Sequence, residues 1–106
     1  MKLYQYTAQN SKLFSFMFSA SIYPTVRVKL GVILEQELSK NPYNEKLLSL
    51  VLFEMYLKAC SFVGEEPVFK EADVKESLEV DEMLYIYTMV MLERSSVISK
   101  GFKRVE

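Results

Sequence analysis

Few side chains in this sequence have the types and spacing that chemistry requires. The chain contains no histidine, so the commonest general base and the commonest metal ligand are both missing. Its single cysteine, Cys60, lies inside a dense apolar stretch, where a buried thiol is inert. Glu65 and Glu66 form a carboxylate pair that could exchange protons or bind Mg²⁺, but solvated loop charge is the simpler interpretation. We therefore expect no enzymatic activity, no metal site and no cofactor.

The stretch that must position everything else runs from Asn44 to Val63. Its apolar residues take nearly every direction around a helix, which predicts a helix surrounded by the rest of the fold. Asn44 suits its start and Gly64 its end. The alternative is a membrane span, but Glu54 and Lys58 would each cost about 2.5–3.5 kcal/mol at its centre. We expect a core helix and no membrane insertion.

The first 22 residues favour a β-hairpin. Met1–Ala8 is rich in residues that favour strands, and the turn formers of 9–11 follow it. Phe14, Phe16 and Phe18 then alternate with smaller side chains, which indicates a second strand with a row of core phenylalanines. A helix that begins after Asn10 is the competing interpretation, because short apolar runs are ambiguous.

Residues 23–42 predict a helix with an uncertain start. Pro24 suits the first helical position, and Tyr23 before it is a boundary, although residues 26–30 also alternate as a strand would. Gly31 weakens a continuous helix by about 0.5–1 kcal/mol. The firmest part of this helix is Val32–Ser39.

Two further helices are predicted after the loop at 65–67. Lys70–Leu78 is a short one, with Ala72, Val74 and Leu78 expected to point inward. Asp81 is the expected N-cap of a long helix from Glu82 to about Ile98, because aspartate at that position accepts orphan backbone N–H groups.

Together these patterns predict a mainly α fold. It is a small helical domain of three to four helices with a short N-terminal β-hairpin or extended arm. We expect one domain over 1–106, made of an arm or hairpin at 1–22, a helical core at 23–100 and a tail at 101–106.

The last helix contains the candidate partner site. A helical projection places Tyr85 and Met89 one turn apart within an otherwise polar arc, beside Glu82 and Glu93. Contiguous exposed apolar surface often marks a partner site, and tyrosine and methionine are enriched at interfaces. The alternative is that this helix is buried on most sides and the two residues belong to the core.

Residues 70–106 also resemble a winged-helix DNA-binding module in the order of their elements: short helix, turn, longer helix, basic tail. That resemblance implies that the long helix reads DNA and that Lys100, Lys103 and Arg104 act from a wing. The glutamates on the would-be reading helix argue against this, because such helices present basic or amide side chains.

Composition completes the prediction of function. The net charge of −1 gives no general attraction to nucleic acid, and a lone cysteine indicates a reducing, cytoplasmic setting. The acids gathered in residues 65–81 could meet a basic partner, or could simply form a solvated face. Because half of the residues are hydrophobic, one small core cannot hide them all. We expect a non-enzymatic protein–protein interaction module that forms a homo-oligomer. It would be an adaptor, assembly factor or inhibitor of the kind found among phage and viral accessory proteins. The alternative is a winged-helix-like DNA-binding regulator.

Overall fold

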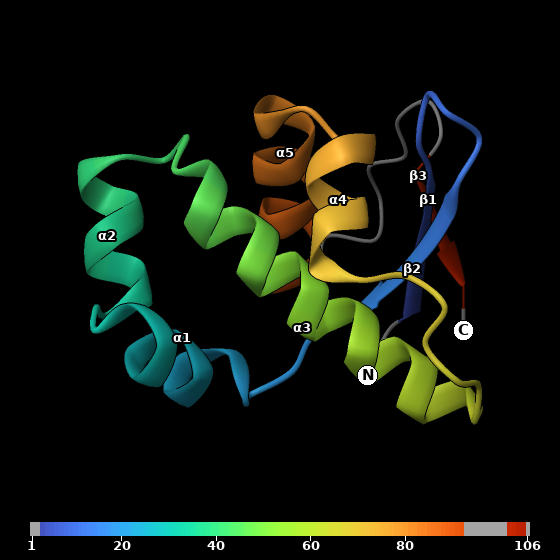
Figure 1. The fold of residues 1–106 in the computed structure, drawn as a ribbon, viewed down its shortest axis with the longest axis horizontal. Helices are drawn as coiled ribbons and strands as arrows, with labels where there is room; N and C mark the ends of the chain where they lie inside the picture. The colour runs from blue at the N-terminus through green and yellow to red at the C-terminus, as the bar shows by residue number, and fades with distance from the viewer. Residues whose placement is uncertain (1–2, 93–101, 106) are drawn as a thin grey trace.

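The computed structural model describes residues 3–92 and 102–105, with side chains over 3–92. A three-stranded antiparallel sheet lies at one end of the molecule, and five helices make up the rest of the described part (Figure 1). The elements in chain order are β1 (Leu3–Thr7), β2 (Leu13–Met17), α1 (Ile22–Leu30), α2 (Leu34–Lys40), α3 (Glu45–Val63), α4 (Glu71–Ser77), α5 (Val80–Leu92) and β3 (Phe102–Val105). The mainly α fold with a β-hairpin is confirmed, whereas the expected three to four helices are five.

The predicted hairpin is confirmed, and a helix beginning after Asn10 is not formed. Ser11 adopts a left-handed conformation (φ 69°) and its N–H donates to the Ala8 carbonyl over 2.9 Å, while Ala8 N–H donates to the Lys12 carbonyl. This is a three-residue hairpin loop with its left-handed residue in the bulge position. The asparagine side chain supports the turn, because Asn10 Oδ1 accepts the Lys12 N–H.

The expected tail contributes a strand to the sheet. β3 pairs antiparallel with β1, so β1 is the central strand in the order β2-β1-β3. The face that carries Tyr4, Tyr6, Phe14 and Phe16 is buried in the main core, which confirms the core role of the phenylalanine row for Phe14 and Phe16. The opposite face is covered at one end only, where Leu3 and Met17 pack with Ala59 of α3.

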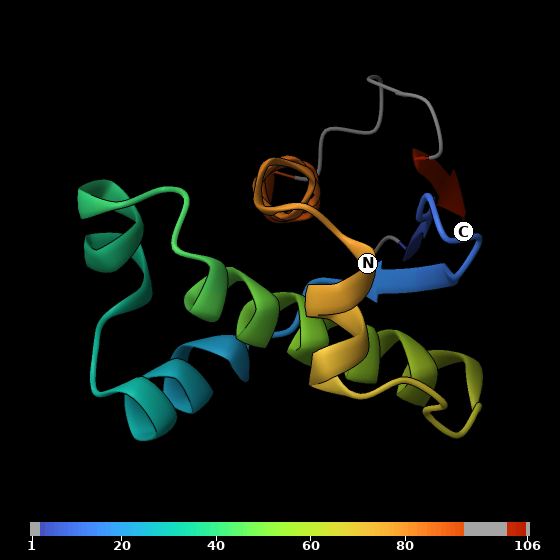
Figure 2. The ribbon, with the colours of Figure 1, turned by 45° about the horizontal axis from the view of Figure 1, so that its top comes forward.

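Helix α3 is the central element of the fold. It packs along β2 and against α1, α4 and α5 (Figure 2), so most of its circumference is covered, as predicted. Asn44 caps its start by accepting the Leu47 N–H over 3.1 Å, and Gly64 ends it with φ 76°. A residue with a Cβ is strained at such a φ, which is why glycine suits this position. No helix in the described ranges is both long and apolar enough to span a bilayer.

The helix predicted before Asn41 is in fact two helices. Gly31 adopts φ 69° and its N–H donates to the Arg27 carbonyl, so it ends α1 instead of weakening a longer helix. Pro24 occupies the third position of α1 and not the first, which is tolerated because the first four N–H groups of a helix have no intrahelical acceptor. The alternative of a strand over 26–30 is wrong.

The starts of α4 and α5 also differ from expectation. Val74 and Leu78 are buried as predicted, but Ala72 is exposed, because α4 has only two turns and one covered side. Helix α5 begins at Val80, and the side chain that caps it is the Glu82 carboxylate, at the third helical position. Glu82 Oε1 accepts the Glu79 N–H over 3.0 Å, as in the reciprocal half of a capping box, so Asp81 is inside the first turn.

Candidate functional site

The structure places the four residues of the predicted partner site in different surroundings. Met89 is buried, with 5% of its surface exposed, so the expectation that it forms an exposed step is wrong. Tyr85 is half-buried and packs against the main core. Helix α5 is covered on more sides than its polar residues suggest, because α3 packs against it. Glu93 lies outside the described residues.

Glu82 connects two elements of the fold instead of facing solvent. While one carboxylate oxygen accepts the Glu79 N–H, the other accepts a hydrogen bond from the Tyr6 hydroxyl of β1. Burial, and next the hydrogen bond to Glu82, raise the pKa of the Tyr6 phenol. One carboxylate oxygen thus caps α5, and the other joins the start of α5 to β1 of the sheet.

The residues of the would-be wing lie in a strand of the central sheet. Lys103 and Arg104 belong to β3, where the backbone register pairs them with Gln5 and Tyr4 of β1. Lys100 lies outside the described residues. Helix α5 carries no lysine or arginine over Val80–Leu92. DNA binding stays a prediction from the sequence, and no feature that the structure describes favours it.

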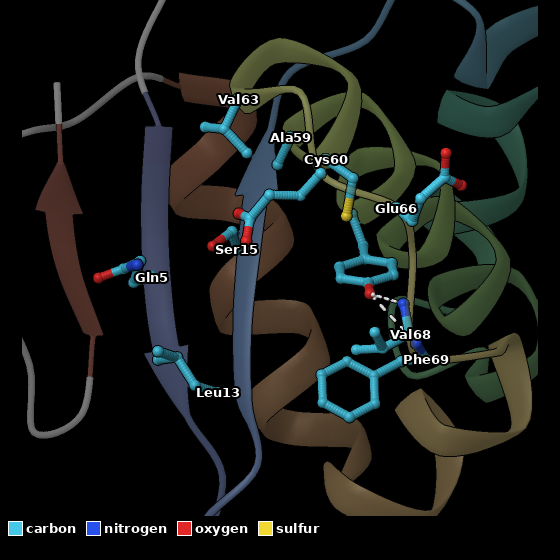
Figure 3. A pocket seen from close by; sticks show the side chains of 11 residues that line it. Gln5, Leu13, Ser15, Ala59, Cys60, Val63, Glu66, Val68 and Phe69 are labelled. Atoms are coloured by element: carbon cyan, nitrogen blue, oxygen red, sulfur yellow. Dashed lines mark hydrogen bonds between the residues drawn. The ribbon is translucent and has the colours of Figure 1, made fainter.

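A groove that the sequence did not predict lies between β2 and the C-terminal end of α3. We call it the β2–α3 groove, and its volume is about 270 Å³. Figure 3 shows Leu13 and Ser15 on its strand side, Ala59, Cys60 and Val63 on its helix side, and Val68 and Phe69 on its loop side. The remaining lining residues are Gln5, Tyr56, Glu65 and Glu66. The sheet face that α3 leaves open beyond Leu3 and Met17 thus becomes one wall of the groove.

Tyr56 fixes the loop wall of the groove. Its hydroxyl accepts the N–H groups of Val68 and Phe69 over 2.8 and 3.1 Å, marked by the dashed lines in Figure 3. Its ring packs edge-on to Phe14 and, tilted, against Phe69, with centroids 6.1 and 5.7 Å apart. Burial, opposed by the two N–H donors and reinforced by Cys60, raises the pKa of Tyr56.

The end of this loop that leads into α4 is also fastened to the hairpin. Lys12 Nζ lies 3.0 Å from Asp73 Oδ1 and 5.7 Å from the centre of the Phe69 ring. The Lys70 N–H and, next, the Lys12 ammonium hold the pKa of the Asp73 carboxyl below its usual value. Asn10 Nδ2 also donates to Ser77 Oγ over 2.9 Å. These contacts join the hairpin to α4 and to the end of the loop between α3 and α4.

The surface of the groove is mixed, with exposed apolar side chains beside polar ones and an acidic rim. Leu13, Val63 and Val68 are all exposed although they are large hydrophobic residues, and Val68 has 78% of its surface free. Glu65 and Glu66 are exposed, and among residues 3–92, whose side chains the structure describes, no lysine or arginine lines the groove. An arrangement of this kind can bind an apolar group that carries positive charge beside it.

A second apolar hollow, of about 180 Å³, lies where α1 meets α2. We call it the α1–α2 hollow; its lining includes Tyr23, Pro24 and Ile33, with Arg27 as its charged residue. Tyr23 and Ile33 are exposed large hydrophobics. The two apolar surfaces involve different helices and different charges, so they would suit different occupants.

Among the residues whose side chains are described, no group of three or more histidine, cysteine, aspartate or glutamate side chains could hold a metal ion. Cys60 is buried at the back of the groove, as its apolar neighbours predicted. Comparisons with protein families, curated proteins and solved structures found no match to this chain.

Proposed function

We propose that this chain is a non-enzymatic protein–protein interaction module, of the adaptor, assembly-factor or inhibitor kind, and that a partner protein docks in the β2–α3 groove. The observation that carries the proposal is that Leu13, Val63 and Val68 line one preformed groove while remaining exposed. Exposed apolar groups gathered in this way commonly mark an interaction site.

The groove is also prepared for binding. The Tyr56 hydroxyl and the Lys12–Asp73 ion pair hold its loop wall in place before any partner arrives. A wall that is already ordered loses little conformational entropy on association, so more of the contact energy contributes to affinity.

The test is affinity capture from the source cell with three immobilised proteins: wild type, Val68→Asp and Val28→Asp. Val28 is 84% exposed on α1, and no α1 residue lines the groove, so its substitution is a matched control for a new surface charge. We expect at least one protein to be captured by wild type and by Val28→Asp but not by Val68→Asp. Equal capture by all three, with all three folded by circular dichroism, would overturn the groove as the docking surface.

Self-association is the second part of the proposal, and the α1–α2 hollow supports it because a second apolar surface is exposed there. Ile33→Asp should lower the molar mass measured by light scattering across a concentration series, because a buried carboxylate at an apolar interface is costly. A mass that is the same for both proteins at every concentration would contradict self-association through this surface.

A further inference from the structure

The β2–α3 groove is too small for a typical organic ligand and large enough for one side chain. Its volume of about 270 Å³ is below the range of about 300–1,000 Å³ usual for small-molecule sites. The apolar part of its lining, with Leu13, Val63 and Phe69, would surround an aliphatic or aromatic side chain. A single apolar side chain presented by a longer chain would fit this volume.

The charge at the rim selects what flanks that side chain. Glu65 and Glu66 are both exposed, and within the described residues neither forms an ion pair. Lys12 of the hairpin, which contacts this loop through the Phe69 ring, is already paired with Asp73. Figure 3 shows the Glu66 carboxylate directed away from β2, at the outer side of the loop. The Glu66 carboxylate can therefore accept from a positive group that passes over the outer side of the loop, while an acidic segment would be repelled.

These carboxylates are attached to a fixed backbone. The Glu65 N–H donates to the Cys60 carbonyl over 2.9 Å at the end of α3, and Val68 and Phe69 are held by the Tyr56 hydroxyl. The negative charge is therefore positioned before binding, which favours electrostatic selection of a partner.

Resting on the proposed function, we propose that the segment bound in the β2–α3 groove is cationic: it inserts one apolar side chain into the groove and places lysine or arginine beside Glu65 and Glu66. The occupant is a segment of a different protein, and charge complementarity distinguishes it from an acidic or neutral one.

The test is a titration of ¹⁵N-labelled protein at low salt with three capped peptides that share glycine ends and contain Lys-Phe-Lys, Glu-Phe-Glu or Lys-Ser-Lys. We expect Lys-Phe-Lys to shift the amide signals of Ser15, Cys60 and Val68, and to bind more tightly than either of the others. Glu65→Gln with Glu66→Gln should weaken it about two- to thirtyfold, as loss of two exposed ion pairs predicts. Glu76→Gln with Glu79→Gln is the control for a change of charge outside the groove, and should leave the affinity unchanged.

The outcomes separate this proposal from the proposed function. The proposal of a cationic segment would be overturned by equal binding of Lys-Phe-Lys and Glu-Phe-Glu at the groove, or by the absence of shifts at the groove with every peptide. The capture experiment with Val68→Asp would still decide separately whether the groove docks a protein. Groove signals that move with protein concentration alone would show that a second copy is the occupant, and would also overturn it.

Discussion

Replacing Tyr56 with phenylalanine would test whether one hydroxyl holds the loop wall of the groove. The ring is 4% exposed and packs against Phe14 and Phe69, so its burial should survive the change. What is lost is the acceptor of two backbone N–H groups, at 2.8 Å for Val68 and 3.1 Å for Phe69. A hydrogen bond contributes about 0.5–1.5 kcal/mol net, so two contribute about 1–3 kcal/mol.

The expected loss lies at the lower end of that range. Val68 is largely exposed, so water can reach its freed N–H and replace part of the lost interaction. We expect Tyr56→Phe to lower the free energy of unfolding by about 1–1.5 kcal/mol in urea, and to lower the melting temperature by about 4–12 °C. Tyr43→Phe is the matched control: Tyr43 is exposed, and its loss of a hydroxyl should change stability by less than about 0.5 kcal/mol.

Hydrogen exchange supplies the decisive measurement. The amides of Val68 and Phe69 should exchange about tenfold faster in Tyr56→Phe, because their acceptor is gone and the loop can open locally. Amides in the middle of α3 open only when the whole protein unfolds, so their protection should fall by no more than the global loss of about 1–1.5 kcal/mol. Unchanged exchange at both loop amides, together with an unchanged urea midpoint, would refute the conclusion that this hydroxyl fixes the wall.

Three further substitutions test other parts of the structure. Tyr6→Phe removes the hydrogen bond to the Glu82 carboxylate and should cost about 1–2 kcal/mol in urea; no loss would show that the cap on α5 alone positions that carboxylate. Gly64→Ala should cost about 1–2 kcal/mol because φ is 76°, whereas Gly64→Asn should cost less, and equal losses would argue against backbone strain. Burial raises the pKa of Tyr87 to about 12, above its ordinary value of 10.0, so the unfolded chain releases this proton first and stability falls between pH 10 and 12. Tyr87→Phe should therefore reduce the loss of stability between pH 9 and 11.5 by at most about 1–2 kcal/mol, and an identical loss would contradict the assignment.

The elements predicted best from the sequence are those that local signals define. Helix α3 has a capping asparagine, a terminal glycine and a dense apolar pattern that predicts a surrounded helix, and the structure reproduces all three. The hairpin has alternating phenylalanines and a polar turn. Gly31 is ambiguous in the sequence, because a glycine between two apolar helical segments can weaken one long helix or mark the end of the first of two.

The features that escaped prediction depend on contacts between distant segments. β3 is a strand because β1 is available to pair with it, and nothing within residues 101–106 alone signals that pairing. Met89 falls in the polar arc of an isolated helix, but the elements packed around α5 bury it. The β2–α3 groove combines a strand, a helix end and a loop; the sequence marks Cys60 as a buried thiol and Glu65 and Glu66 as a carboxylate pair, but no local signal joins them to β2.

The central position of β1 has a consequence for the order in which the protein can fold. β1 leaves the ribosome before β2 and β3, and β2 can pair with it almost at once through a three-residue loop. Its other edge, however, stays unpaired until residues 102–105 have been made, which takes on the order of ten seconds at usual rates of synthesis. During that interval the nascent chain exposes a strand edge that any neighbouring extended segment could join, including the same strand of a second nascent chain. Domain-swapped or aggregated by-products of rapid expression should therefore form through β1. Slower synthesis would not shorten the interval in which this edge is unpaired, but it would lower the concentration of other nascent chains that could join it.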